Sequence, residues 1–377
     1  MPFEYYITKN NKSYRCGYTT GSCAVMAAKA ALEYLFTGIT PEYSGYTTPK
    51  GIYVSAGVSD LKIENGAVSC CVIKDGGDDI DVTDGLKIYA SVRKIENGIS
   101  IDGGEGVGRV TRKGLDCEVG AAAINSVPRR LLKEETEEIC RKYGYTGGIE
   151  IIISVPNGRE AAEKTFNPRL GIEGGISIIG TSGIVEPMST RAIIDTIGAE
   201  LKVMKGSGAE GFIAVPGNYG ENFIKGIKGL EGAETVKFSN YVGELLDFAA
   251  EYKFKNVLLA GHIGKFVKLA GGIMNTHSSF ADCRMEILAA HTALYRGADV
   301  CREIMACTTT DEALELLEKY GVFHQIMDSV AGKAEYYVNM RTRGFVSCGV
   351  IIYSDKRGLL SAGKNGKKLV GEFGGEI

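Results

Sequence analysis

The sequence has no long hydrophobic segment, because no run of about 18 apolar residues occurs anywhere in its 377 residues. We therefore expect no membrane-spanning helix. The first 15 residues are polar and lack the apolar stretch of a signal peptide. The ten cysteines are mostly scattered and none forms a Cys-x-x-Cys pair, so we expect the reduced thiols of a cytoplasmic protein and no zinc ribbon.

Histidine is scarce, with four residues, and no two of them have the four-residue spacing of a metal site on a helix. A metal ion held by the protein is therefore not expected. The sequence also lacks a Gly-x-Ser-x-Gly nucleophile elbow in a strand-turn-helix setting and a Gly-Lys-Ser/Thr phosphate loop. With 43 basic and 46 acidic residues, the chain is not a globally basic protein, and nucleic-acid binding is not expected.

The length predicts two domains, and residues 1–170 have the pattern of the first. Helices are expected at Cys23–Phe36 and Val127–Tyr143. Strands are expected at Leu61–Glu64, Ala67–Ile73, Leu86–Ile95, Ile99–Ile101 and Glu150–Val155. The Asn-Gly pairs at 65–66 and 97–98 predict two hairpins. These elements together indicate a two-layer α+β domain.

The second predicted domain, residues 171–377, alternates strands and helices, which is typical of a Rossmann-like α/β domain with a mostly parallel sheet. Four strand-like runs end in glycine-flanked polar loops: Ile176–Gly180, Phe212–Val215, Glu234–Phe238 and Val257–Ala260. Because such loops meet at the carboxyl edge of a parallel sheet, we expect all four to line one crevice. The remaining predictions are helices at Ser189–Met204, Tyr241–Lys253, Ala281–Tyr295, Asp311–Tyr320 and His324–Met340, and a β pair at Phe345–Ile352 and Leu359–Gly363.

Glycines and hydroxyls are concentrated in segment 15–23, just before the first predicted helix. A helix N-terminus presents unpaired N–H groups and a partial positive charge, which suit a carboxylate or phosphate. Thr19, Thr20 and Ser22 are therefore candidates for substrate binding. A capped helix on the surface is the alternative interpretation.

Five carboxylates lie within ten residues, at 75–84. The spacing does not match a calcium-binding loop, because Asp84 stands where that loop requires glycine. Clustered carboxylates raise one another's proton affinity, which would suit a general base, and Asp78, Asp79 and Asp81 are the candidates. They could equally accept hydrogen bonds from a ligand, or form a solvated turn.

Segment 103–114 is rich in glycine but lacks the strand-to-helix setting of a dinucleotide fingerprint. Its three basic residues, Arg109, Arg112 and Lys113, suit an acidic substrate, because guanidinium groups pair bidentately with carboxylates. A glycine-rich hairpin with an incidental basic face is the alternative.

The crevice loops supply the remaining candidates. His262 lies in the loop after Val257–Ala260 and could act as an acid–base group or a ligand contact. The first crevice loop carries Gly180, Thr181, Ser182 and Gly183, at the position where a doubly wound fold holds its cofactor.

Seven motifs, in the same order along the chain, resemble those of the CbiD family, the cobalt-precorrin-5B C(1)-methyltransferases of anaerobic cobalamin biosynthesis. The matching segments are Gly17–Ala24, Lys74–Thr83, Gly108–Arg112, Asn167–Gly171, Gly174–Met188, Gly261–Lys265 and Asn275–Ser278. Together they span most of the chain. The sequence departs from the usual motifs at Gly76, Ile80 and Ile263, where no polar side chain is lost.

The resemblance implies a methyl transfer from S-adenosylmethionine to C-1 of a tetrapyrrole, giving cobalt-precorrin-6A, with the cobalt carried by the substrate. The acetate and propionate groups of that substrate would bind to basic residues. The candidates are Arg109, Arg112, Lys113, Arg169 and Lys265. Thr181, Ser182 and Asn218, on the first two crevice loops, would contact the donor, and Asp78, Asp79 or His262 would act as the base.

Two other functions remain open at this point. A non-catalytic protein that binds a corrinoid intermediate would need the basic and glycine-rich loops but no donor site. A phosphosugar or nucleotide enzyme could use the same glycine-rich strand ends, but it leaves the seven motifs unexplained. A homo-oligomer is possible, and the sequence does not decide the oligomeric state.

Overall fold

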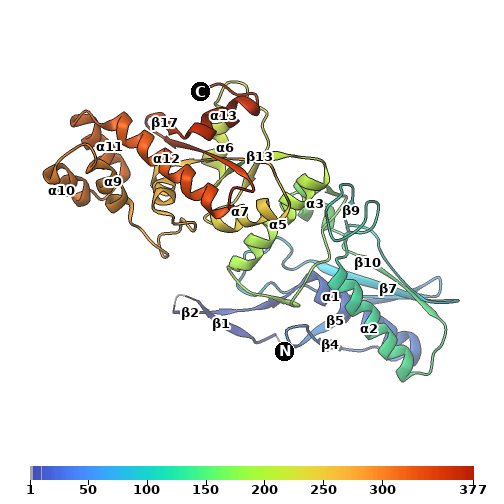
Figure 1. Cartoon of the computed structure of the whole chain (residues 1–377). Helices are drawn as coiled ribbons and strands as arrows, with labels where there is room; N and C mark the ends of the chain where they lie inside the picture. Colours follow the sequence, from blue (N-terminus) through green and yellow to red (C-terminus); the bar gives the residue numbers. More distant parts are fainter. Residues whose placement is uncertain (1–2, 10) are drawn as a thin grey trace. The chain divides into compact units, whose positions relative to one another are not determined.

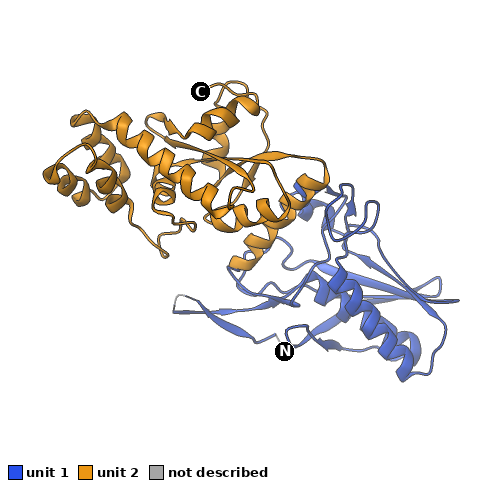
Figure 2. Ribbon diagram, viewed as in Figure 1, with its two compact units in different colours: residues 1–189 blue, residues 190–377 orange. Residues whose placement is uncertain are grey.

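The computed structural model describes residues 3–9 and 11–377. The chain divides into two compact units: unit 1 ends at Ser189 and unit 2 begins at Thr190 (Figure 2). Segment 171–189, which we expected to open the second domain, therefore packs with unit 1. Its side chains explain why, because four isoleucines of this segment are buried in the hydrophobic clusters of unit 1: Ile172, Ile176, Ile178 and Ile184.

Unit 1 is built on a six-stranded sheet with the order β4-β5-β6-β7-β10-β8. The strands are β4 (Tyr43–Thr47), β5 (Tyr53–Glu64), β6 (Ala67–Ile73), β7 (Lys87–Ile95), β8 (Ile99–Gly103) and β10 (Gly148–Ser154). Helix α1 (Thr20–Thr37) packs on this sheet and against α2 (Ser126–Lys142) (Figure 1). Small alanine side chains let α1 approach the sheet closely, and residues 20–28 of the helix are all buried. The expected mixture of α and β structure is confirmed.

Only one of the two predicted hairpins forms. Asn65 and Gly66 both have positive φ and join β5 to β6, as the Asn-Gly signal predicts. The hairpin predicted at Asn97-Gly98 is wrong, because β10 lies between β7 and β8, antiparallel to the first and parallel to the second. The inward-facing isoleucines of β10, such as Ile151, are fully buried, which favours a central position in the sheet.

Short strand pairs join distant segments of unit 1. The pairs are β1 (Tyr6–Lys9) with β2 (Lys12–Arg15), β3 (Gly17–Tyr18) with β12 (Ile184–Val185), and β9 (Arg109–Val110) with β11 (Ile172–Glu173). Two short helices, α3 (Gly158–Ala162) and α4 (Asn167–Leu170), precede β11. Our sequence analysis predicted none of these pairs, because strands of two to four residues are too short to show a periodicity.

Unit 2 contains a five-stranded sheet with the order β14-β13-β15-β16-β17. The strands are β13 (Gly211–Val215), β14 (Thr235–Lys237), β15 (Asn256–His262), β16 (Ser347–Ser354) and β17 (Gly358–Ala362). The first four strands of this order pair in parallel and β17 pairs antiparallel with β16. Helices pack on both faces, so β13 and β15 are near-continuous apolar runs.

The helices of unit 2 include all five that the sequence predicts. They are α5 (Thr190–Gly206), α6 (Asn218–Lys225), α7 (Val242–Glu251), α8 (Ile263–Phe266), the 3₁₀ helix η1 (Val267–Gly271), α9 (Arg284–Thr292), α10 (Ala298–Ala306), α11 (Thr310–Lys319), α12 (Phe323–Arg341) and α13 (Lys364–Glu372). The sequence analysis gave no bounds for α6, α8, η1, α10 or α13. Across residues 3–9 and 11–377, no helix is both long and apolar enough to cross a membrane.

The first predicted crevice strand, Ile176–Gly180, is not part of the parallel sheet. Ile176 and Ile178 instead form isolated parallel bridges with Val107 and Ile124 in unit 1. The apolar side chains of this run are buried as in a strand, but their neighbours belong to the first unit. The expectation that four loops line one sheet edge is therefore wrong, and three of them follow strands of the sheet.

Candidate functional site

Segment 172–188 is central to the candidate site in unit 1, because it contacts the N-terminus of α1. The Gly21 N–H donates to the Ile179 carbonyl at 2.9 Å, and the Thr19 N–H donates to the Gly183 carbonyl at 3.1 Å. The helix N-terminus that we expected to bind an anion thus binds carbonyl groups of this segment.

Two of the three candidate hydroxyls, those of Thr20 and Ser22, bind to the same segment. The Thr20 hydroxyl accepts from the Ile179 N–H at 2.9 Å, and the Ser22 hydroxyl donates to the Gly183 carbonyl at 2.7 Å. Thr20 and Ser22 are only 3% and 1% exposed. The Thr19 hydroxyl, which is half-buried, accepts from the Ser22 N–H at 3.1 Å as the cap of α1. The Thr20 and Ser22 hydroxyls hold the loop that contains the donor candidates Gly180, Thr181, Ser182 and Gly183.

The acidic loop, residues 75–84, forms hydrogen bonds with Arg15, just before α1, and with Met188, at the end of segment 172–188. Arg15 makes a bidentate ion pair with Asp75, at 2.6 and 2.7 Å. The Asp78 carboxylate accepts from the Arg15 N–H at 2.7 Å, and the Asp79 carboxylate accepts from the Met188 N–H at 3.0 Å. Asp78 and Asp79 therefore fix the acidic loop between β2 and the end of segment 172–188.

Two other carboxylates of this loop have lowered pKa values, opposite to the rise expected from their clustering. Burial alone would raise the pKa of Asp81, but the Lys74 ammonium at 2.5 Å and the Thr83 hydroxyl at 2.6 Å hold it below its usual value. Burial likewise opposes ionisation of Asp75, and Arg15 lowers its pKa. Lys74 is 3% exposed, so the pair with Asp81 is an internal ion pair rather than a solvated turn.

Glycines of two motifs meet backbone to backbone in this network. A Cβ atom at Gly17 would overlap the Asp75 carbonyl, and one at Gly77 would overlap the Arg15 carbonyl. Gly77 also has φ +67°, a conformation that other residues adopt only under strain. The close approach of the two motifs therefore requires glycine at both positions.

The basic residues of segment 103–114 divide into two kinds. Arg109 is paired with Asp102 at 2.7 and 3.0 Å and also donates to the Gly103 carbonyl at 2.7 Å. Arg112 and Lys113 are exposed and make no ion pair with any residue that the structure describes. Only these two therefore present charges without an internal counter-ion. Arg169 lies exposed on α4.

Our sequence analysis missed Asn167 as a residue that shapes this region. Its amide nitrogen donates to the Gly175 carbonyl at 3.0 Å, and its amide oxygen accepts from the Ser177 hydroxyl at 3.2 Å. Asn167 is 8% exposed. A polar residue followed by proline reads as an ordinary helix start, so the local pattern gives no sign of this role.

In unit 2, three of the predicted crevice loops follow adjacent parallel strands. The chain runs from β13 outward to β14 and then returns to β15 on the other side, so the topological switch point lies between β13 and β15. Asn218 begins α6 after β13, and His262 ends β15. The switch point of an open parallel sheet is where ligands bind.

Asn218 is held by a small network of charges. Its side-chain oxygen accepts from the Lys237 ammonium at 2.7 Å, and Lys237 also pairs with Glu221 at 2.6 Å. Hydrogen bonds from Lys225 and Lys237 lower the pKa of Glu221 to about 2. Lys237 and Glu221 were not candidates in the sequence analysis, because they become neighbours only when α6 packs beside β14.

His262 caps the short helix α8. Its Nδ1 accepts from the Gly264 N–H at 3.1 Å, and its ring meets Tyr353 edge to face with centroids 5.7 Å apart. Accepting at Nδ1 leaves any proton of the neutral ring on the other nitrogen. The ring is half-buried, as an acid–base or ligand-binding group would be.

Two lysines follow His262 within six residues. Burial lowers the pKa of Lys265, and the nearby charge of Lys268 lowers it further. Lys265 is half-buried and forms no ion pair with a described residue. Lys268, which is 3% exposed, donates to the carbonyl groups of Thr276 and Ala281 at 3.2 and 2.8 Å. The sequence analysis missed Lys268, which links the Gly261–Lys265 and Asn275–Ser278 motifs.

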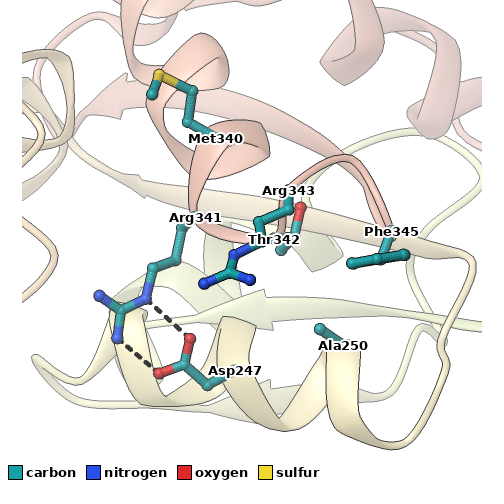
Figure 3. Close-up of a pocket in the computed structure, with 7 residues that line it drawn as sticks. All are labelled: Asp247, Ala250, Met340, Arg341, Thr342, Arg343 and Phe345. Carbon is teal, nitrogen blue, oxygen red and sulfur yellow. Dashed lines mark hydrogen bonds and ion pairs between the residues drawn. The ribbon is translucent and has the colours of Figure 1, made fainter.

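A hollow of about 550 Å³ in unit 2 lies away from these residues (Figure 3). Arg341 and Asp247 pair across it at 2.8 and 2.6 Å, and Phe345 borders it just before β16 begins. It is therefore at the amino end of the parallel strands, whereas ligands of such sheets bind beyond the carboxyl ends. We do not assign the donor or acceptor to it.

No group of three or more His, Cys, Asp or Glu side chains is arranged to hold a metal ion among residues 3–9 and 11–377. The acidic loop illustrates the reason, because its carboxylates bind Arg15, Lys74 and backbone N–H groups. Each of the five carboxylates of this loop accepts a hydrogen bond from at least one donor of the protein.

Comparison with known proteins agrees with the motifs. Residues 7–187, nearly all of unit 1, match the family model CbiD, and residues 275–364 match the model of the CbiD C-terminal domain. Proteins named cobalt-precorrin-5B C(1)-methyltransferase are similar over nearly the whole chain. One from Ruminiclostridium cellulolyticum is 48% identical, covering 93% of this chain and 92% of the relative. One from Alkaliphilus metalliredigens is 44% identical, covering 95% and 94%.

A crystal structure of the cobalamin biosynthesis protein cbiD from Archaeoglobus fulgidus is 27% identical and covers 74% of this chain and 87% of that one, with a TM-score of 0.40. The family assignment rests on the sequence matches, which extend over both units. The chain belongs to the CbiD family.

Proposed function

We propose that this protein is a cobalt-precorrin-5B C(1)-methyltransferase that methylates C-1 of cobalt-precorrin-5B and yields cobalt-precorrin-6A in anaerobic cobalamin biosynthesis. Relatives with that name match more than nine-tenths of both chains. The observation that carries the proposal is the convergence of three family motifs, 17–24, 74–83 and 174–188, in one hydrogen-bonded network of unit 1. Such a network is what a preorganised site requires.

The acceptor is the cobalt-containing tetrapyrrole, and we propose that its carboxylates bind to basic residues that have no internal counter-ion. Arg112 and Lys113 meet that condition, and Lys265 is a separate candidate that also meets it. Arg109 is already paired with Asp102, so its proposed role is to position the glycine-rich loop. Arg169 is retained as a candidate on its place in the Asn167–Gly171 motif.

The proposed methyl donor is S-adenosylmethionine, and the switch point of unit 2 suits it. We propose that unit 2 is a Rossmann-like domain, and the parallel pairing of four of its five strands with helices on both faces supports this. Asn218 would bind the donor there, since its amide group retains donors after accepting from Lys237. Gly180–Gly183 do not follow a strand of the parallel sheet, so their position gives no reason to place the donor there. Their proposed contact with the donor rests on the family motif alone.

The donor supplies an activated methyl group, so the protein's task is to hold and orient the two reactants. Positioning can supply roughly 7–11 kcal/mol of barrier lowering at the well-oriented limit. His262, Asp78 and Asp79 are the proposed groups to accept a proton from the macrocycle. The cobalt enters with the substrate, so this assignment needs no metal site of the protein's own. We place the protein in the cytoplasm, acting on a small-molecule partner, with no role in nucleic-acid binding.

The direct test is anaerobic incubation with cobalt-precorrin-5B and methyl-labelled S-adenosylmethionine, followed by mass spectrometry. We expect one labelled methyl group in the product. Asp78→Asn keeps an oxygen that can accept the Arg15 N–H but removes the charge, and His262→Ala removes the ring. If either group is the base, its variant should lower the single-turnover rate by about 100-fold or more, with donor binding retained.

One result would contradict the proposed base, and another would contradict the enzyme assignment. Full single-turnover rates in Asp78→Asn, Asp79→Asn and His262→Ala would exclude all three as the base while leaving the reaction intact. Absence of labelled product together with absence of donor binding in calorimetry would overturn the enzyme assignment. That second result would favour a non-catalytic protein that binds a corrinoid intermediate.

A further inference from the structure

The Asn275–Ser278 motif has no role in the proposed function, yet it lies at the carboxyl edge of the parallel sheet of unit 2. The loop that follows β14 binds it there. The Thr276 N–H and hydroxyl donate to the backbone and side-chain oxygen atoms of Asn240, at 3.0 and 3.1 Å. Asn275 also forms a β-bridge with Tyr241, the residue before α7.

The loop after β14 is in turn joined to the loop after β13. The Ser239 N–H donates to the Pro216 carbonyl at 3.1 Å, and Lys237 donates to the side-chain oxygen of Asn218 at 2.7 Å. Hydrogen bonds therefore connect the Asn275–Ser278 motif, through the β14 loop, with the loop that carries Asn218. Ligands of open parallel sheets bind beyond this edge.

A buried lysine holds the same motif from the interior. Lys268 is 3% exposed and donates to the Thr276 and Ala281 carbonyl groups, at 3.2 and 2.8 Å. Within the part of the chain that the structure describes, Lys268 forms no ion pair. Asp282, whose charge acts on it, is paired with Arg284 at 2.5 Å. Burying an ammonium without a contacting carboxylate is costly, and costs of this kind are typical of functional sites.

His277 is the ring that this loop exposes. Its Nδ1 accepts from the Ser279 N–H at 3.1 Å and lies 2.7 Å from the Ser279 hydroxyl. The neutral ring therefore carries its proton on Nε2, which has no partner among the described residues. The His277 N–H donates to the Asn275 side chain at 3.0 Å, and Lys268 binds the carbonyl of the same peptide group, that of Thr276. The backbone that carries the ring is thus held on both sides.

A carboxylate is the ligand group that suits this arrangement. Nε2 offers an exposed N–H donor, and the charge of the buried Lys268 ammonium, which no carboxylate contacts, favours a negative group nearby. Both reactants of the proposed methyl transfer carry carboxylates. The donor has one on its amino-acid portion, and the acceptor has its acetate and propionate groups.

We propose that His277 Nε2 donates a hydrogen bond to a carboxylate of a reactant bound at the carboxyl edge of unit 2, and that Lys268 positions His277 for this contact. The inference rests on the proposed methyl transfer. His277 is a binding residue in it, whereas Lys268 acts only through the loop 275–281.

The first test is calorimetric titration of the full chain with S-adenosylmethionine and with decarboxylated S-adenosylmethionine. If the carboxylate belongs to the donor, His277→Ala should weaken binding of S-adenosylmethionine by about tenfold or more and binding of the decarboxylated analogue by less than about twofold. His277→Gln should recover part of the loss, because its amide N–H can take the place of the Nε2–H.

If the carboxylate belongs to the acceptor, both donor affinities stay at the wild-type values. In the anaerobic assay, His277→Ala should then raise the KM for cobalt-precorrin-5B by about tenfold or more and leave kcat within about twofold. Wild-type values for both the donor affinity and this KM would overturn the proposal. Failure of the proposed function differs from this result, because the wild-type chain itself would then neither bind the donor nor form labelled product.

The second test concerns Lys268. Lys268→Met removes the ammonium and keeps the length of the side chain, and it should weaken the same carboxylate-dependent step. Because Lys268 acts through His277, the double variant Lys268→Met/His277→Ala should lose little more than His277→Ala alone. The matched control is Lys255→Met, since Lys255 precedes β15 at the amino end of the strands and pairs with Glu210 at 2.8 Å.

Multiplicative losses in the double variant, or an equal loss for Lys255→Met, would overturn the positioning role. Circular dichroism shows whether each variant is folded. If Lys268→Met is unfolded, Lys268→Gln, which keeps an amide donor for the two carbonyl groups, replaces it with the same criteria.

Discussion

At the scale of single residues, the ion pair of Arg15 and Asp75 shows how unit 1 keeps a carboxylate charged beside other carboxylates. The two side chains are about a quarter exposed, and the guanidinium binds both carboxylate oxygens. A planar guanidinium matches a carboxylate in a way that an ammonium cannot. Asp75 also accepts from the Gly77 N–H at 2.8 Å, so its charge helps to fix the turn of the acidic loop.

Asp75→Asn should lower the free energy of unfolding by about 1–3 kcal/mol at pH 7, because it leaves Arg15 without its counter-ion. The folded state depresses the pKa of Asp75 below its usual 3.8. The stabilisation is therefore complete above pH 4 to 5 and is lost as the pH falls through the lower, folded pKa. Urea unfolding followed by circular dichroism at several pH values measures the difference between variant and wild type.

The control for Asp75→Asn is Glu134→Gln, which removes an exposed ion pair with Arg130 one helical turn away on α2. We expect a loss of no more than about 0.5 kcal/mol at any pH. A loss for Asp75→Asn that stays constant from pH 7 to pH 2 would show that the charge of Asp75 does not stabilise the fold.

At the scale of elements, the contact between the acidic loop and segment 15–17 depends on glycine. Gly77→Ala should destabilise unit 1 by about 3 kcal/mol or more, because the added methyl group meets the Arg15 carbonyl and φ is +67°. Gly66→Ala is the matched control, since φ is +75° there but no atom lies within 4 Å of the added Cβ. Its expected cost is about 1 kcal/mol.

Thermal unfolding of the two glycine variants separates strain from close packing. The difference between them reports the packing of the two backbone segments alone. Equal losses for Gly77→Ala and Gly66→Ala would mean that the acidic loop can move away from segment 15–17 without cost.

At the scale of the whole molecule, the position of the boundary between folding units can be tested directly. We propose that residues 1–189 fold alone, whereas residues 1–170 do not, because the shorter fragment lacks four buried isoleucines of segment 171–189. Each buried isoleucine contributes about 1.5–3 kcal/mol, so their loss is comparable with a total stability of about 5–15 kcal/mol. Cooperative urea unfolding of both fragments is the measurement. A folded 1–170 fragment would restore the boundary near residue 171.

Much of the fold was predictable, and the exceptions share a cause. The run Ile176–Gly180 has the apolar pattern of a crevice strand but packs on Val107 and Ile124. The pair Asn97-Gly98 has the signal of a hairpin, yet β10 occupies the place between the two strands. In both cases the sequence correctly predicts extended segments. The segment that each of them pairs with, however, lies 50 or more residues away in the sequence.

The candidate site divides in the same way. The sequence alone determined which charged residues, glycines and hydroxyl groups the motifs supply, and it pointed to the family, because the order of these residues does not depend on folding. Only the tertiary structure decided that Arg109 is paired with Asp102 while Arg112 is not, and that Thr20 holds Ile179 across 159 residues. Hydrogen-bond partners at that separation depend on how the whole unit packs, and no periodicity of neighbouring residues encodes them.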